Sequence, residues 1–221
     1  MKILVIDVGG TNVKMLASGQ EDPRKFPSGP TLTPDAMVEG ALRETKDWEY
    51  DHITIGYPGP VVNGKAVLEP KNLGPGWVDY NFKAKFRKPV RLINDAAMQA
   101  LGSYKGGRML FLGLGTGLGS ALVIENVVAP LELAHLPYKK YKTFEDYVGL
   151  RGLERLGKKR WQAAVEDVVA RLQAALGADS VVLGGGNAKK LKRLPPGVRL
   201  GDNLNAFVGG FRLWEDDTMK A

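Results

Sequence analysis

The segment "KILVIDVGGTNVKMLAS", residues 2–18, decides the fold class. Apolar residues fill positions 3–6, Gly9 and Gly10 interrupt them, and alternation of apolar and polar residues resumes at Val13. This pattern predicts a strand, a tight turn and a second strand. The segment "RMLFLGLGTGLGSALVIENV", residues 108–127, repeats the same order. Two copies of one hairpin indicate an internal duplication, with one copy in each of two lobes.

Between and after these hairpins, strands and helices alternate, which favours an α/β layered fold. Thr33 is a predicted N-cap and Pro34 the first residue of the helix that follows it. We predict strands at 52–57, 89–95 and 180–186, and helices at 96–104, 143–156, 160–176, 187–194 and 205–216. With a hinge near 91–96, the expected lobes are residues 1–93 and 94–221, and the last helix is expected to pack back on the N-terminal lobe.

Composition describes a soluble globular protein of 221 residues, with 44% hydrophobic and 25% charged residues. The sequence contains no apolar run of about 20 residues and no pattern typical of a signal peptide. The absence of cysteine excludes disulfides, a thiolate nucleophile and cysteine-ligated zinc. We therefore expect a cytoplasmic protein that does not bind membranes.

Positive charge is the second feature of the composition, with a net charge of +7. The basic residues form short clusters at 138–142, 157–160 and 188–193. They are not accompanied by a nucleic-acid recognition motif, so nucleic acid is not an expected partner. Two interpretations stay open: solvated basic faces, or a lining for a polyanionic substrate.

The glycine turns are candidate anion sites, because backbone amides without a neighbouring Cβ form a concavity that binds anions. The spacing does not match a dinucleotide-binding fingerprint or a P-loop. Two such turns facing each other across a cleft would hold a phosphate chain from both sides. The expected phosphate-binding residues are Asp7, Gly9, Gly10, Thr11, Lys14, Gly115, Thr116 and Gly117. A third cluster, Gly184, Gly185 and Gly186, precedes a predicted helix and is a candidate nucleotide site.

Asn94 and Asp95 lie where a buried strand ends and a helix begins. One interpretation is that Asp95 caps the helix. The other is that its carboxylate takes a proton from an attacking hydroxyl in phosphoryl transfer. Asp7, at the end of the first strand, would then orient Mg²⁺ through water.

Glu132 and His135, three residues apart, are candidate ligands for vicinal sugar hydroxyls. On a helical turn they would share one face, with a bidentate acceptor beside an imidazole. The same pair could ligate a metal, but a stable site needs further ligands.

The chain resembles sugar kinases of the ROK family on five segments in the family's order: "IDVGGTNVK" (6–14), "INDA" (93–96), "LGLGTGLGS" (112–120), "ELAH" (132–135) and "VLGGG" (182–186). The resemblance implies the two-lobed actin-like ATPase fold, which is related to ribonuclease H, with a central cleft. It also implies that Asp95 is the catalytic base and that the sugar ligands are Asn94, Asp95, Glu132, His135 and Glu145. Ala134 replaces a glycine of the family's "E-x-G-H" motif. The family's cysteine-rich zinc loop is missing, so we expect no zinc site.

The short connection between the second glycine turn and "ELAH" is similar to the polyphosphate glucokinase branch of the family. The implied reaction is transfer of a phosphoryl group from polyphosphate or ATP to the 6-hydroxyl of glucose with Mg²⁺, and a homodimer is implied. Alternatives are a kinase for another hexose or an N-acetylated amino sugar, or a non-catalytic sugar-sensing protein. The sensing alternative is less favoured, because family repressors carry an N-terminal helix-turn-helix.

Overall fold

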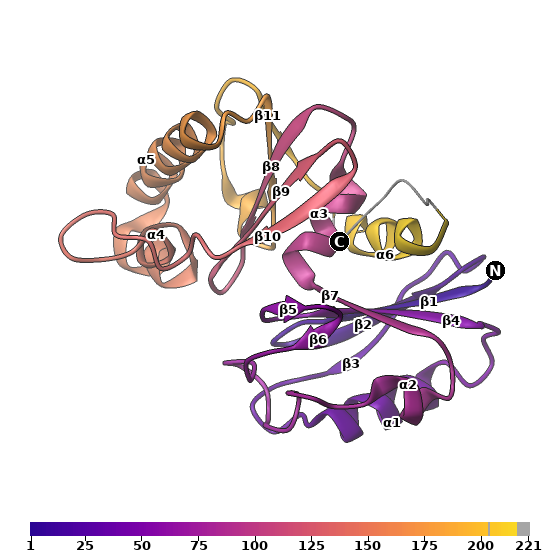
Figure 1. Cartoon of the computed structure of the whole chain (residues 1–221). Coiled ribbons are helices and arrows are strands. Elements are labelled where there is room, and N and C mark those ends of the chain that lie inside the picture. The colour runs from indigo at the N-terminus through magenta and orange to yellow at the C-terminus, as the bar shows by residue number, and fades with distance from the viewer. Residues whose placement is uncertain (203, 216–221) are drawn as a thin grey trace.

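A computed structural model describes residues 1–202 and 204–215 (Figure 1). It contains two five-stranded sheets and a small hairpin of β5 (Val61–Val62) and β6 (Lys65–Ala66). The N-terminal sheet has the order β3 (Arg24–Pro27), β2 (Asn12–Ala17), β1 (Ile3–Val8), β4 (His52–Tyr57), β7 (Val90–Asn94). The C-terminal sheet has the order β10 (Val127–Leu131), β9 (Leu118–Ile124), β8 (Arg108–Leu114), β11 (Ser180–Gly184), β12 (Val198–Leu200).

Strand directions are the same in the two sheets. In each, the first three strands of the chain form an antiparallel meander, and the last two run parallel to the first. The hairpin repeated in the sequence is therefore the start of two sheets with one topology. As a consequence, both glycine turns follow the carboxyl end of the first strand of a sheet.

Helices cover the outer faces and fill the space between the sheets (Figure 1). Helices α1 (Pro34–Glu44) and α2 (Phe82–Phe86) lie on the N-terminal sheet, and α4 (Phe144–Val148) and α5 (Leu150–Leu176) belong to the C-terminal half. Helices α3 (Asp95–Ser103) and α6 (Asn205–Glu215) lie between the sheets. Their apolar residues share one buried cluster with side chains of both sheets, such as Val5 and Phe111. Among the described residues, no helix is both long and apolar enough to cross a bilayer.

Helices α3 and α6 touch through glycine. A Cβ at Gly102 would lie 1.8 Å from the carbonyl oxygen of Asn205, and one at Gly209 would lie 1.8 Å from that of Met98. Helix α6 also contacts the N-terminal sheet, where Thr54 Oγ1 donates to Gly210 O at 2.7 Å and accepts from Trp214 Nε1 at 2.9 Å. The predicted last residue of this helix, 216, lies outside the described residues.

Two helix predictions need correction. Residues 187–194 form only the 3₁₀ turn η1 (Ala188–Lys190), because the amide of Asn187 donates to Leu114 O at 2.9 Å and ties the segment to β8. The predicted helix at 143–156 is interrupted at Gly149, whose extended backbone separates α4 from α5. Helix α5 then kinks at Gly157, which has a φ of 72°. Six short elements were not predicted from the sequence: strands β3, β5, β6, β10 and β12, and helix α2.

Candidate active site

The first glycine turn, residues 9–11, connects β1 to β2. Gly9 N donates to Asn12 O at 3.1 Å, and Ser28 Oγ donates to Gly9 O at 2.5 Å. Gly10 and Thr11 are exposed. A Cβ on Gly10 would lie 3.4 Å from the Cβ of Asn72, so the loop after β6 lies beside this turn. The turn therefore presents open backbone to a ligand, as an anion site requires.

Asp7 lies at the end of β1, opposite Lys14 in the register of the hairpin. Burial raises the pKa of Asp7, and the positive charge of Lys14 lowers it in part. Gly56 on β4 leaves space for the side chains of Met98 and Asp7, because a Cβ on it would lie 2.2 Å from Met98 Cε and 3.7 Å from Asp7 Oδ1. A carboxylate that loses its hydration in this way gains from a nearby cation.

The second glycine turn, residues 115–117, connects β8 to β9 and is held by side chains from elsewhere. Asn187 Nδ2 donates to Gly115 O at 2.8 Å. Thr116 O accepts from Leu150 N at 3.2 Å, while the rest of Thr116 is exposed. Gly185, with a φ of 79°, packs on the end of β8 just before this turn, since a Cβ there would lie 2.6 Å from the backbone of Leu114. Gly185 of the third glycine cluster thus lies close to the second turn.

Asn94 and Asp95 connect β7 to α3. The structure corrects the alternative in which Asp95 is the cap: Asn94 is the N-cap, and its Oδ1 accepts from Ala97 N at 3.0 Å. Asn94 Nδ2 donates to Gly59 O at 3.0 Å, which leaves one amide hydrogen and one lone pair for a ligand. Asp95 is the first helical residue, and its Oδ1 accepts from Ala96 N at 2.7 Å.

Asp95 is a buried carboxyl whose pKa is raised into the neutral range. Burial, followed by the negative charges of Asp7 and Glu132, raises its pKa to about 7, although its bond to Ala96 N lowers it. Its neighbour Ala96 packs on β9, because a Cβ on Gly119 would lie 3.0 Å from the Cβ of Ala96. Asp95 therefore lies near residues of both glycine hairpins, where the two sheets meet.

Glu132 and His135 follow β10 in a turn rather than on a helix, with Leu136 N donating to Leu133 O at 3.2 Å. The expectation of a shared helical face is wrong, because the chain leaves the sheet edge directly into this turn. Both side chains are exposed, and the charge of Glu132 influences Asp95. His135 Nε2 lies 3.0 Å from Nζ of Lys71, a residue that sequence reasoning missed.

Glu145, in the first turn of α4, contacts the second glycine turn. Its Oε2 accepts from Leu118 N at 3.2 Å, and its Oε1 lies 3.2 Å from Arg151 Nη2. Its own amide donates to Ala134 O at 3.0 Å. Glu145 therefore links the second glycine turn to the turn that carries Glu132 and His135. No sequence signal points to Arg151, which reaches this site only through the fold.

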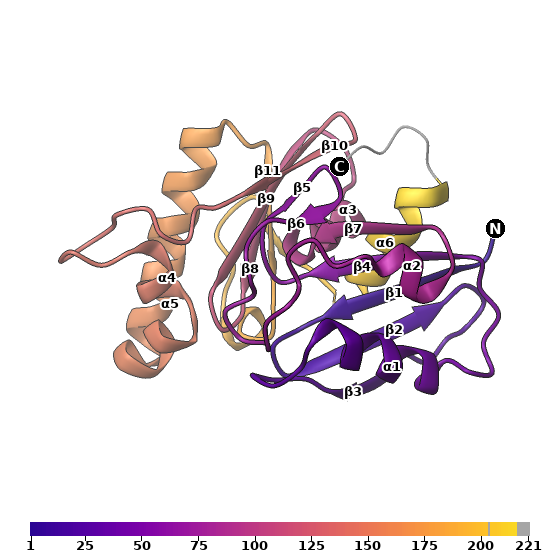
Figure 2. The same ribbon diagram turned by 60° about the horizontal axis from the view of Figure 1, so that its bottom comes forward.

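The segment 137–143 forms a small hairpin that projects from the molecule (Figures 1 and 2). Tyr138 N donates to Lys142 O at 2.8 Å, and the Tyr138 hydroxyl donates to Asp167 of α5. Lys139 pairs with the same carboxylate at 2.8 Å. Within residues 1–202 and 204–215, no group of three or more histidine and acidic side chains could hold a metal ion.

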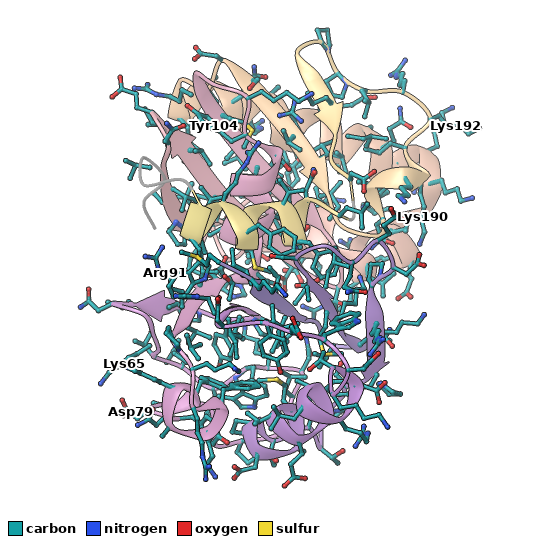
Figure 3. The ribbon with its side chains drawn as sticks, turned by 90° about the vertical axis from the view of Figure 1, so that its right-hand side faces the viewer. Lys65, Asp79, Arg91, Tyr104, Lys190 and Lys192 are labelled. Carbon is teal, nitrogen blue, oxygen red and sulfur yellow. The ribbon has the colours of Figure 1, made fainter. Side chains whose placement is uncertain are left out.

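Part of the third basic cluster lies near the second glycine turn. Lys190 Nζ donates to Asn187 Oδ1 at 2.7 Å, and Asn187 in turn binds Gly115. Lys190 and Lys192 lie on one side of the C-terminal half, away from Tyr104 (Figure 3). Arg193 pairs instead with Glu166 of α5 at 2.9 Å. Two basic side chains, Arg151 and Lys190, are thus each bound to a residue that contacts the second turn.

Comparison with known proteins places this geometry in a family. Residues 3–129 match the model of the ROK family, and the chain belongs to it. A polyphosphate glucokinase from Mycobacterium tuberculosis (strain CDC 1551 / Oshkosh) is 25% identical over 217 residues, which is 86% of this chain and 80% of the relative. A Bacillus subtilis (strain 168) protein, provisionally named a fructokinase, is 30% identical over 139 residues, 54% of this chain and 45% of that relative's length.

The fold is shared with a kinase of known crystal structure. The crystal structure of an inorganic polyphosphate/ATP-glucomannokinase from Arthrobacter sp. strain KM superposes with a TM-score of 0.81 at 21% identity, covering 95% of this chain and 96% of the other. The expected actin-like ATPase fold is therefore confirmed.

Proposed function

We propose that this chain is a hexose kinase that transfers a phosphoryl group from polyphosphate or ATP to the 6-hydroxyl of glucose. The observation that carries the proposal is Asp95, whose pKa of about 7 suits proton abstraction near neutral pH. It lies at the junction of two glycine hairpins with exposed threonines, Thr11 and Thr116. The ROK match and the polyphosphate glucokinase relative support the same activity.

In the proposed reaction, Asp95 accepts the proton of the sugar hydroxyl as that oxygen attacks the terminal phosphorus. The bond from phosphorus to the bridging oxygen breaks, and ADP or a shortened polyphosphate leaves with that electron pair. Backbone amides and threonine hydroxyls of the two glycine turns stabilise the charge on the phosphoryl oxygens. The sugar is held by Asn94, Glu132, His135 and Glu145.

The residues present fit Mg²⁺ as the cofactor. Magnesium is usually held by one or two carboxylates together with waters and substrate phosphates, so a cage of protein ligands is not needed. Asp7 is a buried carboxylate beside the first glycine turn, and its raised pKa marks a place where a cation is favourable. Bound there, the ion would neutralise phosphate charge.

The proposal includes both phosphoryl donors, polyphosphate and ATP. Arg151 and Lys190, near the second glycine turn, favour a long polyanion such as polyphosphate. The close packing of Gly185 on the backbone of Leu114, just before that turn, favours a nucleotide on the same side. The name of the Arthrobacter enzyme includes both donors.

The proposal includes a kinase of two lobes, residues 1–93 and 94–221, that close on the sugar, and a cytoplasmic homodimer. The interlobe position of α3 and α6 supports the lobes. Size-exclusion chromatography with light scattering measures the oligomeric state.

A screen of ATP and polyphosphate against glucose, mannose, fructose and N-acetylglucosamine tests the activity. We expect glucose 6-phosphate as the main product. Transfer mainly to fructose would favour the alternative that the Bacillus subtilis relative suggests. Sugar binding by folded protein without transfer from either donor would contradict the proposal and favour a sensing role.

A further inference from the structure

Lys71 reaches the proposed sugar site from the N-terminal half of the molecule. Its Nζ lies 3.0 Å from Nε2 of His135, across 64 residues of sequence. Lys71 belongs to the loop between β6 and α2, whereas His135 follows β10 of the C-terminal sheet. The contact therefore joins the two halves beside the sugar ligands.

The loop that carries Lys71 is fixed on both sides of this residue. Two positions before it, the Glu69 carboxylate accepts from Gly76 N and Trp77 N, each at 3.1 Å. Two positions after it, Leu73 is buried, and Gly74 N then donates to Leu32 O at 3.0 Å. A lysine on a fixed backbone has less freedom to lose when its ammonium is held in one place.

The turn that carries His135 is fixed in the same way. Ala134 is buried, and its carbonyl accepts from Glu145 N at 3.0 Å. On the other side, Leu136 O accepts from Phe144 N at 3.1 Å. Both backbones are thus held independently of the contact between Lys71 and His135.

The chemistry of this contact sets the state of the imidazole. A lysine ammonium has three donors and no acceptor, so Nε2 of His135 must be the acceptor. The imidazole is then neutral and carries its proton on Nδ1. Nδ1, the ring nitrogen that does not contact Lys71, can then only donate a hydrogen bond.

We infer that Lys71 is a positioning residue, which holds His135 as the Nδ1–H tautomer so that Nδ1–H donates to an oxygen of the bound sugar. The role in sugar binding rests on the proposed function, whereas the tautomer does not. Without Lys71, the imidazole can exchange its two tautomers, and only one of them presents this donor.

Nuclear magnetic resonance reads the tautomer directly. The chain has two histidines, so a His135→Ala variant assigns both sets of ring signals in two-bond ¹⁵N–¹H spectra of the full chain. His52, whose Nδ1 lies 2.6 Å from Asp51 Oδ1, is the internal reference. We expect a protonated Nδ1 and a bare Nε2 on His135 in the wild type. In Lys71→Met, we expect a protonated Nε2 population on His135 and an unchanged His52.

Kinetics then measures the contribution to sugar binding. Lys71→Met should raise KM for glucose about three- to fivefold, as for one exposed charged contact, with kcat within about twofold. Lys71→Arg should restore KM, because arginine also donates only. Lys83→Met on α2 removes the same charge elsewhere and should change neither constant.

A wild-type His135 with protonated Nε2, an unchanged tautomer in Lys71→Met, or an equal rise in KM in Lys83→Met would each overturn the inference. The tautomer is measured without turnover. The tautomer inference can therefore be contradicted while kinase activity is found, and it can be confirmed while kinase activity is absent.

Discussion

The two glycine turns have the same place in sheets of the same topology, yet their surroundings differ. The first turn is supported by the N-terminal half, with Ser28, next to β3, bound to Gly9 and Asn72, in the loop after β6, beside Gly10. The second is held by side chains of the segment after β11 and of α4, with Asn187 bound to Gly115 and Glu145 bound to Leu118. The two turns thus share one backbone arrangement, while their supporting contacts differ. We infer that the first turn is the more open partner and the second the more fixed.

The largest expected effect comes from Asp95, which lies where the two hairpins meet. Asp95→Asn keeps the shape and the acceptor for Ala96 N but removes the base. We expect kcat to fall by about 10²–10⁴-fold, with sugar affinity nearly unchanged. In the wild type, kcat/KM should rise with pH through a pKa near 7. If the turnover of Asp95→Asn were close to that of the wild type, Asp95 would not be the general base.

The same substitution should affect stability in a direction set by proton linkage. The folded pKa of about 7 lies above the unfolded value of about 3.9, so the folded state binds more protons between these values. Stability of the wild type therefore falls as pH rises through this window. Asp95→Asn should be more stable than the wild type by roughly 1–3 kcal/mol at about pH 8 and similar at about pH 4. Urea unfolding at both pH values measures this, and an equal difference at both would contradict it.

Alanine substitutions in the turns test their different support. A Cβ on Gly117 would lie 2.2 Å from Glu145 Oε2, so Glu145 must move and Leu118 N loses its acceptor. Gly117→Ala should cost about 1–2 kcal/mol of unfolding free energy.

Two controls have more room. For Gly115→Ala, no atom of the described residues other than its two chain neighbours lies within 4 Å of the new Cβ, and for Gly10→Ala the nearest is Asn72 Cβ at 3.4 Å. Both should change unfolding free energy by less than about 0.5 kcal/mol. Equal losses in all three variants would mean that the support of the turns does not differ.

The smallest expected effects come from the side chains that hold each turn. Ser28→Ala removes a bond to Gly9 O, and Asn187→Ala removes one to Gly115 O. Each should raise the donor KM about two- to fivefold, as for one hydrogen bond. Asn187→Ala should raise the donor KM more than Ser28→Ala, because it also removes the hydrogen-bond acceptor of Lys190. A larger effect of Ser28→Ala would reverse our ranking of the turns.

The sequence predicts those parts of the molecule that depend on local pattern. Both hairpins, the helix that begins at Pro34 and the strand that ends at Asn94 follow from periodicity and capping. The prediction of a helix at 187–194 was wrong, because the amide of Asn187 donates a hydrogen bond to β8, which is distant in sequence. Lys71 was missed for the same reason: its position depends on the path of a loop fixed by Glu69, not on spacing along the chain.

The packing of α6 has a consequence for the order of folding. The first strand of the chain is covered by one of the last helices, since a Cβ on Gly210 would lie 2.4 Å from Val5 Cγ1. Ile3, Val5, Phe207 and Leu213 share one buried cluster. During synthesis, the face of β1 that packs on α6 stays uncovered until α6 has left the ribosome. Contacts of such long sequence separation slow folding, so the N-terminal half should gain its full protection from proteolysis only when the chain is nearly complete.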